Sequence, residues 1–280
     1  MAARVHLLHA GYARNEGVAG TVSLVIDGSA MIVVDPGMVA DRELILAPLR
    51  ALEVEPDEVT HVVITHHHPD HTINIALFPN AEVVDFWARY SGDQWMDHPG
   101  DGHRVSDHTT LILTPGHTKE DATLLVETDD GVMAFTHAWW RGDRTPEIDP
   151  LADDQAALEV SRRRILGAAD TVIPGHGEPF DEVGAALERA YSRLHAFEED
   201  PARLARHAVR VILTFALLEK QRLPLASLPA YVENTGVLRD INRRFFALTP
   251  QNFAEWLVHE LERASAVKRD GEDLVPLITP

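Results

Sequence analysis

The segment THHHPDH at residues 65–71 constrains this chain more than any other feature of its sequence. It directly follows the apolar run HVVIT, which is typical of a buried strand. In an extended loop alternate side chains point the same way, so His66 and His68 can converge on one ion. Asp70 and His71 come one turn later and can face a second ion. Because imidazole and carboxylate groups bind metals, the pattern favours a metal site over a solvated histidine-rich loop.

Two further histidines follow apolar runs in the same way. His117 lies in TPGHT, directly after TLILT, and His176 lies in PGHG, directly after TVI. The flanking glycines let the backbone turn sharply and bring each imidazole close to its neighbours. A single loop histidine is usually a surface residue, but the repeated context favours both as metal ligands.

The chain contains no cysteine, which excludes disulfides and thiolate ligands. Any metal must therefore be bound by His, Asp or Glu, and we expect one or two zinc ions, with iron or manganese as alternatives. The first residues lack the pattern of a signal peptide, and no apolar run is long enough to cross a membrane. We therefore expect a cytoplasmic protein without a membrane partner, and no feature indicates its oligomeric state.

The order of strand and helix patterns predicts an α/β sandwich with outer helices in residues 1–200. Short apolar runs bounded by Gly, Asp and Pro indicate strands, and 26–29 is typical of a tight hairpin turn. The predicted strands lie within 4–11, 21–28, 30–37, 61–65, 81–87, 110–114, 122–128, 131–137 and 171–177, and the predicted helices at 41–52, 70–78 and 149–169.

Residues 201–280 have a different pattern and are predicted to form a helical C-terminal extension. Helices are expected near 201–221, 225–234, 236–247 and 250–266, and a hairpin is expected to turn at Asp270-Gly271. Helices followed by a small hairpin suit a winged-helix-like unit. The alternative is a helical cap packed on the catalytic domain.

The motifs THHHPDH, TPGHT and PGHG, in this order and spacing, resemble the metallo-β-lactamase superfamily over about residues 3–185. The resemblance implies an αββα sandwich with its metals at one edge, between the sheets. The segments LFPNA and DDQAALEVSRRRILGAADTVIPGHGEPF are similar to a narrower group, the stand-alone metallo-β-lactamase-domain proteins linked in animals to histone pre-mRNA 3′ processing. The resemblance implies two metal sites, the first with His66, His68 and His117 and the second with Asp70, His71 and His176.

The sequence departs from this family at one position. Members usually place a metal-bridging Asp after the strand that here reads GVMAFTHAWW, where His137 stands and Asp143 lies six residues on. A carboxylate can bridge two cations less than about 4 Å apart, whereas the two imidazole nitrogens point in opposite directions. Either His137 binds one ion and leaves the second site weak or empty, or Asp143 reaches in and His137 is no ligand.

Charge and metal chemistry together suggest an activity. A bound divalent metal lowers the pKa of water and supplies hydroxide at neutral pH. We therefore expect a hydrolase that attacks a small ester, thioester or lactone with metal-bound hydroxide, and Asp70 to orient the water or collect its proton besides binding metal. Residues 1–200 carry a net charge of −21 and residues 201–280 of +2, which disfavours nucleic acid as a partner.

Three alternatives remain at this level: a phosphodiesterase or nuclease acting on RNA, an iron-dependent oxygenase, and a metal-binding protein without turnover. His67 lies between two predicted ligands, and alternation points it away from them, so a supporting role is expected. Trp87, Trp95 and Met96 fall in a segment predicted to be rich in loops, which could form part of a pocket rim.

Overall fold

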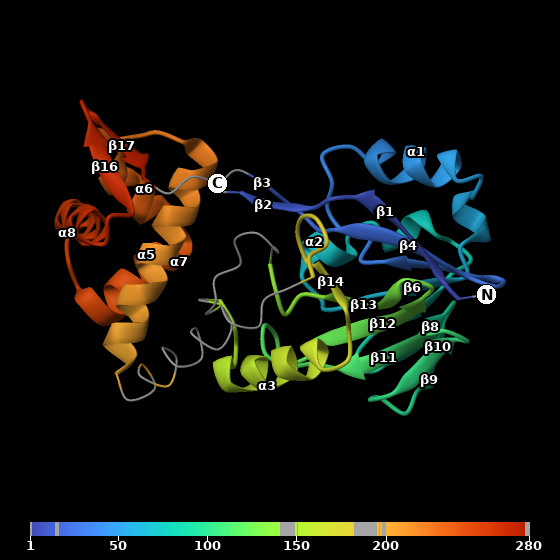
Figure 1. Cartoon of the computed structure of the whole chain (residues 1–280). Helices are drawn as coiled ribbons and strands as arrows, with labels where there is room; N and C mark the ends of the chain where they lie inside the picture. The colour runs from blue at the N-terminus through green and yellow to red at the C-terminus, as the bar shows by residue number, and fades with distance from the viewer. Residues whose placement is uncertain are drawn as a thin grey trace. The chain divides into compact units, whose positions relative to one another are not determined.

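The structure is a computed structural model that describes residues 2–14, 17–140, 149, 151–181, 195, 197 and 200–277. The chain divides into two compact units, Met1–Leu187 and Glu188–Pro280, which Figure 1 colours from blue to yellow and from yellow to red. Each unit is described by itself. The domain boundary predicted at residue 200 stays a prediction.

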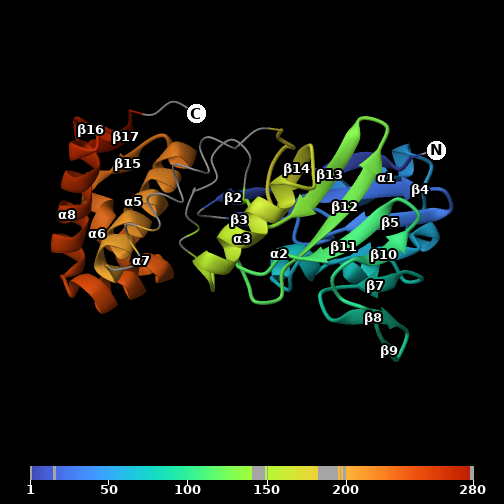
Figure 2. The ribbon, with the colours of Figure 1, turned by 60° about the horizontal axis from the view of Figure 1, so that its bottom comes forward.

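The first unit contains two large sheets. The seven-stranded sheet has the order β1-β4-β5-β6-β7-β8-β9, with β5, β6 and β7 parallel, and the five-stranded sheet has the order β10-β11-β12-β13-β14, with β13 and β14 parallel. Figure 2 shows β10 to β13 side by side. The first sheet consists of β1 (Arg4–His9), β4 (Val22–Asp27), β5 (Ala30–Val34), β6 (His61–Val63), β7 (Glu82–Val84), β8 (Ala88–Ser91) and β9 (Gln94–Asp97). The second consists of β10 (His103–Ser106), β11 (Thr109–Leu113), β12 (Ala122–Thr128), β13 (Gly131–Thr136) and β14 (Thr171–Pro174).

A shared apolar core joins the two sheets face to face. Successive strand residues point to opposite faces of a sheet, so Val25, Ile32 and Val63 contribute to the core that also contains Leu124 and Phe135 of the second sheet. The opposite face of the first sheet packs against α1 (Glu43–Ala51). The helix α3 (Gln155–Leu166) lies on the other side of the paired sheets (Figure 1). This layering confirms the predicted αββα sandwich.

Several sequence predictions for this unit are confirmed in detail. The β4–β5 hairpin turns at Gly28, whose φ of 60° suits glycine. The helix predicted at 149–169 begins at Gln155, because the Asp154 side chain accepts a hydrogen bond from the backbone of Ala157. Among the helices of the described residues, none is long and apolar enough to cross a membrane.

Other predictions for this unit need correction. The helix predicted at 70–78 is two short turns, α2 (Pro69–Thr72) and the 3₁₀ helix η2 (Ile75–Leu77). Asn74 separates them, because its backbone N–H and side-chain amide donate to the carbonyls of Pro36 and Gly37. The segment predicted to be rich in loops around Trp95 is instead the β8–β9 hairpin, which turns at Gly92 with a φ of 61°.

Short elements without a strong sequence pattern complete the first unit. The strands β2 (Tyr12–Arg14) and β3 (Gly17–Ala19) pair antiparallel, and η1 (Pro56–Glu58) is a 3₁₀ helix. The helix predicted at 41–52 begins at Glu43, whose backbone N–H donates to the Asp41 side chain.

The second unit combines helices with a small sheet. Its order is helix, short strand, helices and hairpin, which is the order of a winged-helix-like unit, and the hairpin turns at Asp270-Gly271 as predicted. The short strand β15, which pairs with β17, was not predicted. The elements are α5 (Pro201–Lys220), β15 (Leu223–Pro224), η3 (Leu225–Ser227), α6 (Leu228–Asn234), α7 (Gly236–Ile241), the π-helical turn η4 (Asn242–Phe246), α8 (Pro250–Arg263), β16 (Val267–Asp270) and β17 (Asp273–Pro276).

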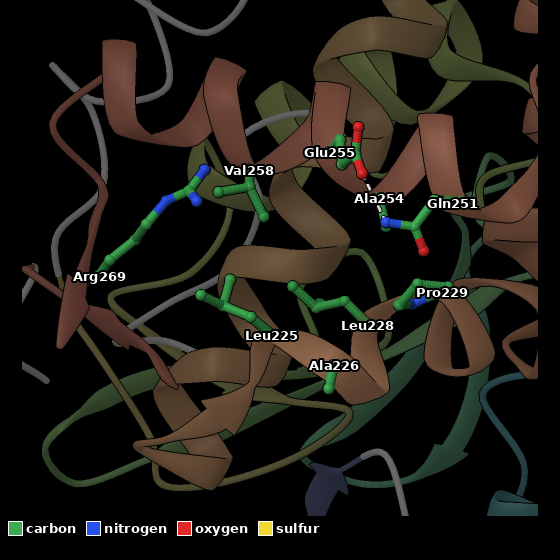
Figure 3. A pocket seen from close by; sticks show the side chains of 9 residues that line it. All are labelled: Leu225, Ala226, Leu228, Pro229, Gln251, Ala254, Glu255, Val258 and Arg269. Atoms are coloured by element: carbon green, nitrogen blue, oxygen red, sulfur yellow. Dashed lines mark hydrogen bonds between the residues drawn. The ribbon is translucent and has the colours of Figure 1, made fainter. Parts of the chain in front are cut away.

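The second unit has its own apolar core, in which Leu213 of α5, Val232 of α6 and Phe253 of α8 are buried. A pocket of about 290 Å³ lies between α8 and the segment 225–229 (Figure 3). The exposed positions of α8 include Gln251, Glu255, His259 and Arg263.

Candidate metal centre

The ends of five strands of the first unit meet at the histidine motif. Asp35 follows β5, His66 follows β6, His117 follows β11, His137 follows β13 and His176 follows β14. Each of these side chains is buried. Strand ends of two facing sheets therefore supply side chains to one cluster.

The first group of ligand atoms belongs to His66, His68 and His117. His66 Nε2 lies 3.0 Å from His68 Nδ1, and His68 Nδ1 lies 3.3 Å from His117 Nε2. His66 and His117 are buried, whereas His68 is exposed. Two histidines from the motif and one from the second sheet thus bring three nitrogens together, at a position that solvent can reach.

Hydrogen bonds fix which nitrogen two of these rings present. The Thr65 hydroxyl donates to Asp35 Oδ2 at 2.6 Å, so it can only accept from His66 Nδ1, which lies 3.2 Å away. His117 Nδ1 donates to Asp149 Oδ2 at 2.7 Å. Both rings therefore present an unprotonated Nε2 to the group, which is the arrangement that carboxylate-supported histidine ligands show in metal sites.

The second group consists of Asp70, His71 and His176. Asp70 Oδ2 lies 3.4 Å from His71 Nε2 and 3.6 Å from His176 Nε2. The outer nitrogens are held in place, because His71 Nδ1 donates to Asp35 at 2.9 Å and His176 Nδ1 donates to the Ala19 carbonyl at 2.8 Å. This group again turns its Nε2 atoms inward.

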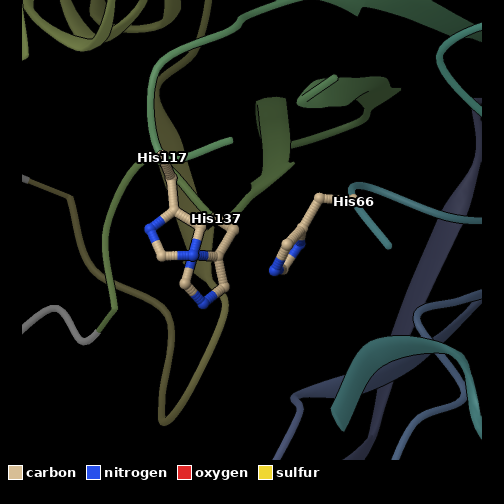
Figure 4. Close-up of side chains that lie close together, drawn as sticks. All are labelled: His66, His117 and His137. Atoms are coloured by element: carbon tan, nitrogen blue, oxygen red, sulfur yellow. The ribbon is translucent and has the colours of Figure 1, made fainter. Parts of the chain in front are cut away.

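His137 lies between the two groups. Its ligand nitrogens are close enough to share an ion with His66 and His117, or with His71 and His176. Figure 4 shows His66 reaching in from one side and His117 and His137 from the other. Gly175 makes room for the ring, because a Cβ on this residue would lie 2.1 Å from His137 Cδ2.

The charges of the cluster favour a cation. Burial alone would lower the pKa of His71, but the carboxylates of Asp35 and Asp70 raise it to about 9. Burial alone would raise the pKa of Asp70, but His71 lowers it to about 2. Burial and the charge of His71 lower the pKa of His176 to about 4, and burial holds the pKa of His137 well below its ordinary value. The carboxylates therefore stabilise positive charge amid imidazoles that keep a free lone pair.

The donor spacing fits metal ions. Two nitrogens that share a tetrahedral zinc at about 2.0–2.1 Å lie about 3.3 Å apart, and the observed separations in the first group are 3.0 and 3.3 Å. In the part of the chain that the structure describes, His71 Nε2 is buried without a hydrogen-bond partner. A bound cation would satisfy such an atom, so the residues present fit the metals that the sequence suggests.

The structure brings all seven sequence-predicted ligands into this cluster, and their role as ligands stays a prediction. His67 points away, as expected: its Nε2 lies 2.9 Å from Asp85 and its ring stacks on Trp87. Asp143, the alternative to His137, lies outside the described residues.

Two supporting residues were missed from the sequence. Asp35 lies in the predicted strand segment AMIVVDPG and directly follows the observed strand β5, so the strand-end argument applied to the histidines could have found it. Asp149 also accepts from Trp140 Nε1 at 3.0 Å and lies 32 residues after His117. No local pattern indicates that contact.

Comparison with known proteins identifies the class. The family model of the metallo-β-lactamase superfamily matches residues 15–207, so the chain belongs to this superfamily, a family of hydrolases. It is 35% identical over 194 residues to metallo-beta-lactamase domain-containing protein 1 of Xenopus laevis, covering 63% of this chain and 80% of the relative.

Two further relatives extend the comparison. Thioesterase pkgB of Emericella nidulans is 27% identical over 192 residues, which cover 66% of this chain and 54% of that protein. A crystal structure of a metallo-β-lactamase-type protein from Thermotoga maritima superimposes with a TM-score of 0.53 at 18% identity, covering 65% of this chain and all of that one. The last similarity supports the fold.

Proposed function

We propose that this chain is a zinc-dependent hydrolase of small esters, thioesters or lactones, with the reaction at the group formed by His66, His68 and His117. The observation that carries the proposal is the convergence of three imidazole nitrogens separated by 3.0 and 3.3 Å beside an exposed His68. Three histidines that leave one position free are a ligand set of catalytic zinc. A zinc ion bound there would supply Lewis acidity, which acidifies water and polarises the scissile oxygen.

The protein's own residues would position this chemistry. Asp149 and Thr65 hold His117 and His66 with Nε2 facing the group. Asp70 is ionised at neutral pH, since its pKa is lowered to about 2. A general base works best with a pKa near the operating pH, so Asp70 suits metal binding and the orientation of water better than proton collection.

Charge and exposed apolar side chains support the substrate class. The chain has a net charge of −19, which repels polyanions. Met38 and Ile73 are exposed apolar residues close to the motif: the Met38 backbone N–H donates to the Asp70 carbonyl at 3.1 Å, and Ile73 ends α2. An acyl group would bury the exposed side chains of Met38 and Ile73, and one relative carries the name thioesterase.

The test is a substrate panel on protein of measured metal content. The panel contains a chromogenic thioester, an aryl ester, a lactone and a phosphodiester, and each is assayed with metal-loaded protein, chelated protein and His68→Ala. We expect turnover of at least one carbonyl substrate that scales with bound zinc and disappears in both controls. Faster cleavage of the phosphodiester, or no turnover at full zinc occupancy, would overturn the proposal.

A further inference from the structure

We infer that His137 completes the second group as a fourth protein ligand, so that this site is closed and structural while the first site is open and exchangeable. The inference rests on the proposed metal-dependent function and adds a division of labour between the two ions. It makes His137 a ligand of one ion, rather than only a residue that replaces a bridging carboxylate.

The ligand nitrogens of His137 lie within 4.8 Å of both pairs, His66 with His117 and His71 with His176, and its Nε2 makes a contact of hydrogen-bond length with the second pair. Its Nε2 lies 3.2 Å from His176 Nε2, close to the separation of about 3.3 Å between two ligands of one tetrahedral zinc. The His137 ring is inclined by 48° to the ring of His66 and by 40° to that of His117, and the ring centroids lie 4.3 and 4.1 Å apart. Its Nε2 therefore contacts the second group, while its ring also lies against the rings of the first.

The ligand nitrogens of His71, His137 and His176 lie within 4.8 Å of one another, and Asp70 lies beside two of them. Asp70 Oδ2 lies 3.4 Å from His71 Nε2 and 3.6 Å from His176 Nε2, and His137 Nε2 adds the contact at 3.2 Å. The three histidines are buried. Four protein ligands around one ion are the mark of a structural zinc site, because no position remains for water or substrate.

The first group has the opposite character. It contains three imidazoles and no carboxylate, and His68 is exposed. The carboxylate of Asp149 supports this group without being a donor in it, because it contacts the outer nitrogen of His117 rather than the nitrogen that faces the group. In the second group Asp70 lies among the donors, and Asp35 supports His71 at 2.9 Å. More donors and more charge predict tighter binding in the second group.

The inference departs from one expectation from the sequence, which stays untested. Counting only the lost bridge predicted a weak or empty second site, because an imidazole cannot link two close cations. The fourth donor outweighs that loss, since each ion then has its own set of ligands. Gly175 is consistent with this placement, because any Cβ there would collide with the His137 ring.

The experiment measures zinc retained by the full-length protein during graded chelation with dipicolinate, together with the midpoint of thermal unfolding. We expect wild type to lose about one ion readily and to keep about one until it unfolds. His68→Ala should lack the easily lost ion and keep the other, with little change in the unfolding midpoint. His137→Ala should lose both ions to the chelator, and its unfolding midpoint should no longer depend on zinc.

A second variant guards against misfolding of His137→Ala. His137→Asp restores a carboxylate that can bridge, so both ions should be retained but should leave together rather than in two steps. Two-step release in His137→Asp, or unchanged retention in His137→Ala, would overturn the inference. Because zinc content and unfolding need no substrate, a protein that hydrolyses nothing in the panel would defeat the proposed function and leave this result standing.

Discussion

The two ligand groups of the cluster are built from nearly the same side chains, yet they differ in access and charge. The first has three imidazoles, one of them on the exposed His68. The second has the buried His71 and His176, by our inference His137 as well, and Asp70, whose carboxylate lies 3.4 and 3.6 Å from the first two. We infer that the number of donors, their exposure and the carboxylate of Asp70 distinguish the site proposed to react from the site proposed to hold its ion.

The largest effect is expected from variants that remove a ligand of the first group. His66→Ala and His68→Ala each remove a direct ligand, so hydrolysis should fall below detection and bound zinc should drop by about one ion per chain. Elemental analysis and the substrate panel check both losses. Full metal content in both variants would show that these residues are not ligands.

A smaller effect is expected from a substitution beside the second group that displaces His137. Gly175→Ala would place a Cβ 2.1 Å from His137 Cδ2, so the ring must move; such overpacking costs about 1–3 kcal/mol. We expect a lower unfolding midpoint and the loss of the slowly released ion. Gly17→Ala is the matched control, because its Cβ would meet only Tyr12 at 3.7 Å. Equal behaviour of the two variants would mean that the position of His137 does not matter for metal retention.

Asp149→Asn tests the support of the first group alone. The amide cannot accept from His117 Nδ1 with the strength of a carboxylate, and removal of such a partner lowers metal affinity or activity about 10–100-fold. The slowly released ion should stay. Zinc affinity and kcat/KM, measured on the same preparation, separate this positioning effect from general damage, which would lower the retention of both ions.

The smallest effect is expected at His67. This side chain contacts Asp85 at 2.9 Å and stacks on Trp87, away from both groups. His67→Ala should therefore leave the zinc content nearly unchanged. A loss of zinc comparable to that of His66→Ala would show that the alternation of side chains along the motif has been assigned the wrong way round.

Local pattern predicted the strands and the histidine cluster, but it could not predict what supports them. Short apolar runs bounded by Gly, Asp or Pro predicted β4, β5, β11 and β12, and the strand-end histidines predicted the cluster, whose role in metal binding stays a prediction. The helix predicted at 70–78 is interrupted because Asn74 bonds to Pro36 and Gly37, more than thirty residues away. The contact between His117 and Asp149 also spans 32 residues. Such pairings arise only when the chain has folded.

The β8–β9 hairpin and the strand β15 were missed for a different reason. Trp95 is 65% exposed in an edge hairpin, so burial imposes no alternation on its sequence. β15 contains two residues, Leu223 and Pro224, which is too short for any period to appear. Strands that bury little apolar surface leave little trace in sequence.

The most direct test of a closed and an open site is a zinc titration of metal-free protein, in which thioester hydrolysis and the unfolding midpoint are followed together. The closed group should fill first, so the midpoint should rise over the first equivalent of zinc while activity stays low. Hydrolysis should then appear between one and two equivalents, as the open group fills. Activity that rises in proportion to the first equivalent and stops there would contradict the account.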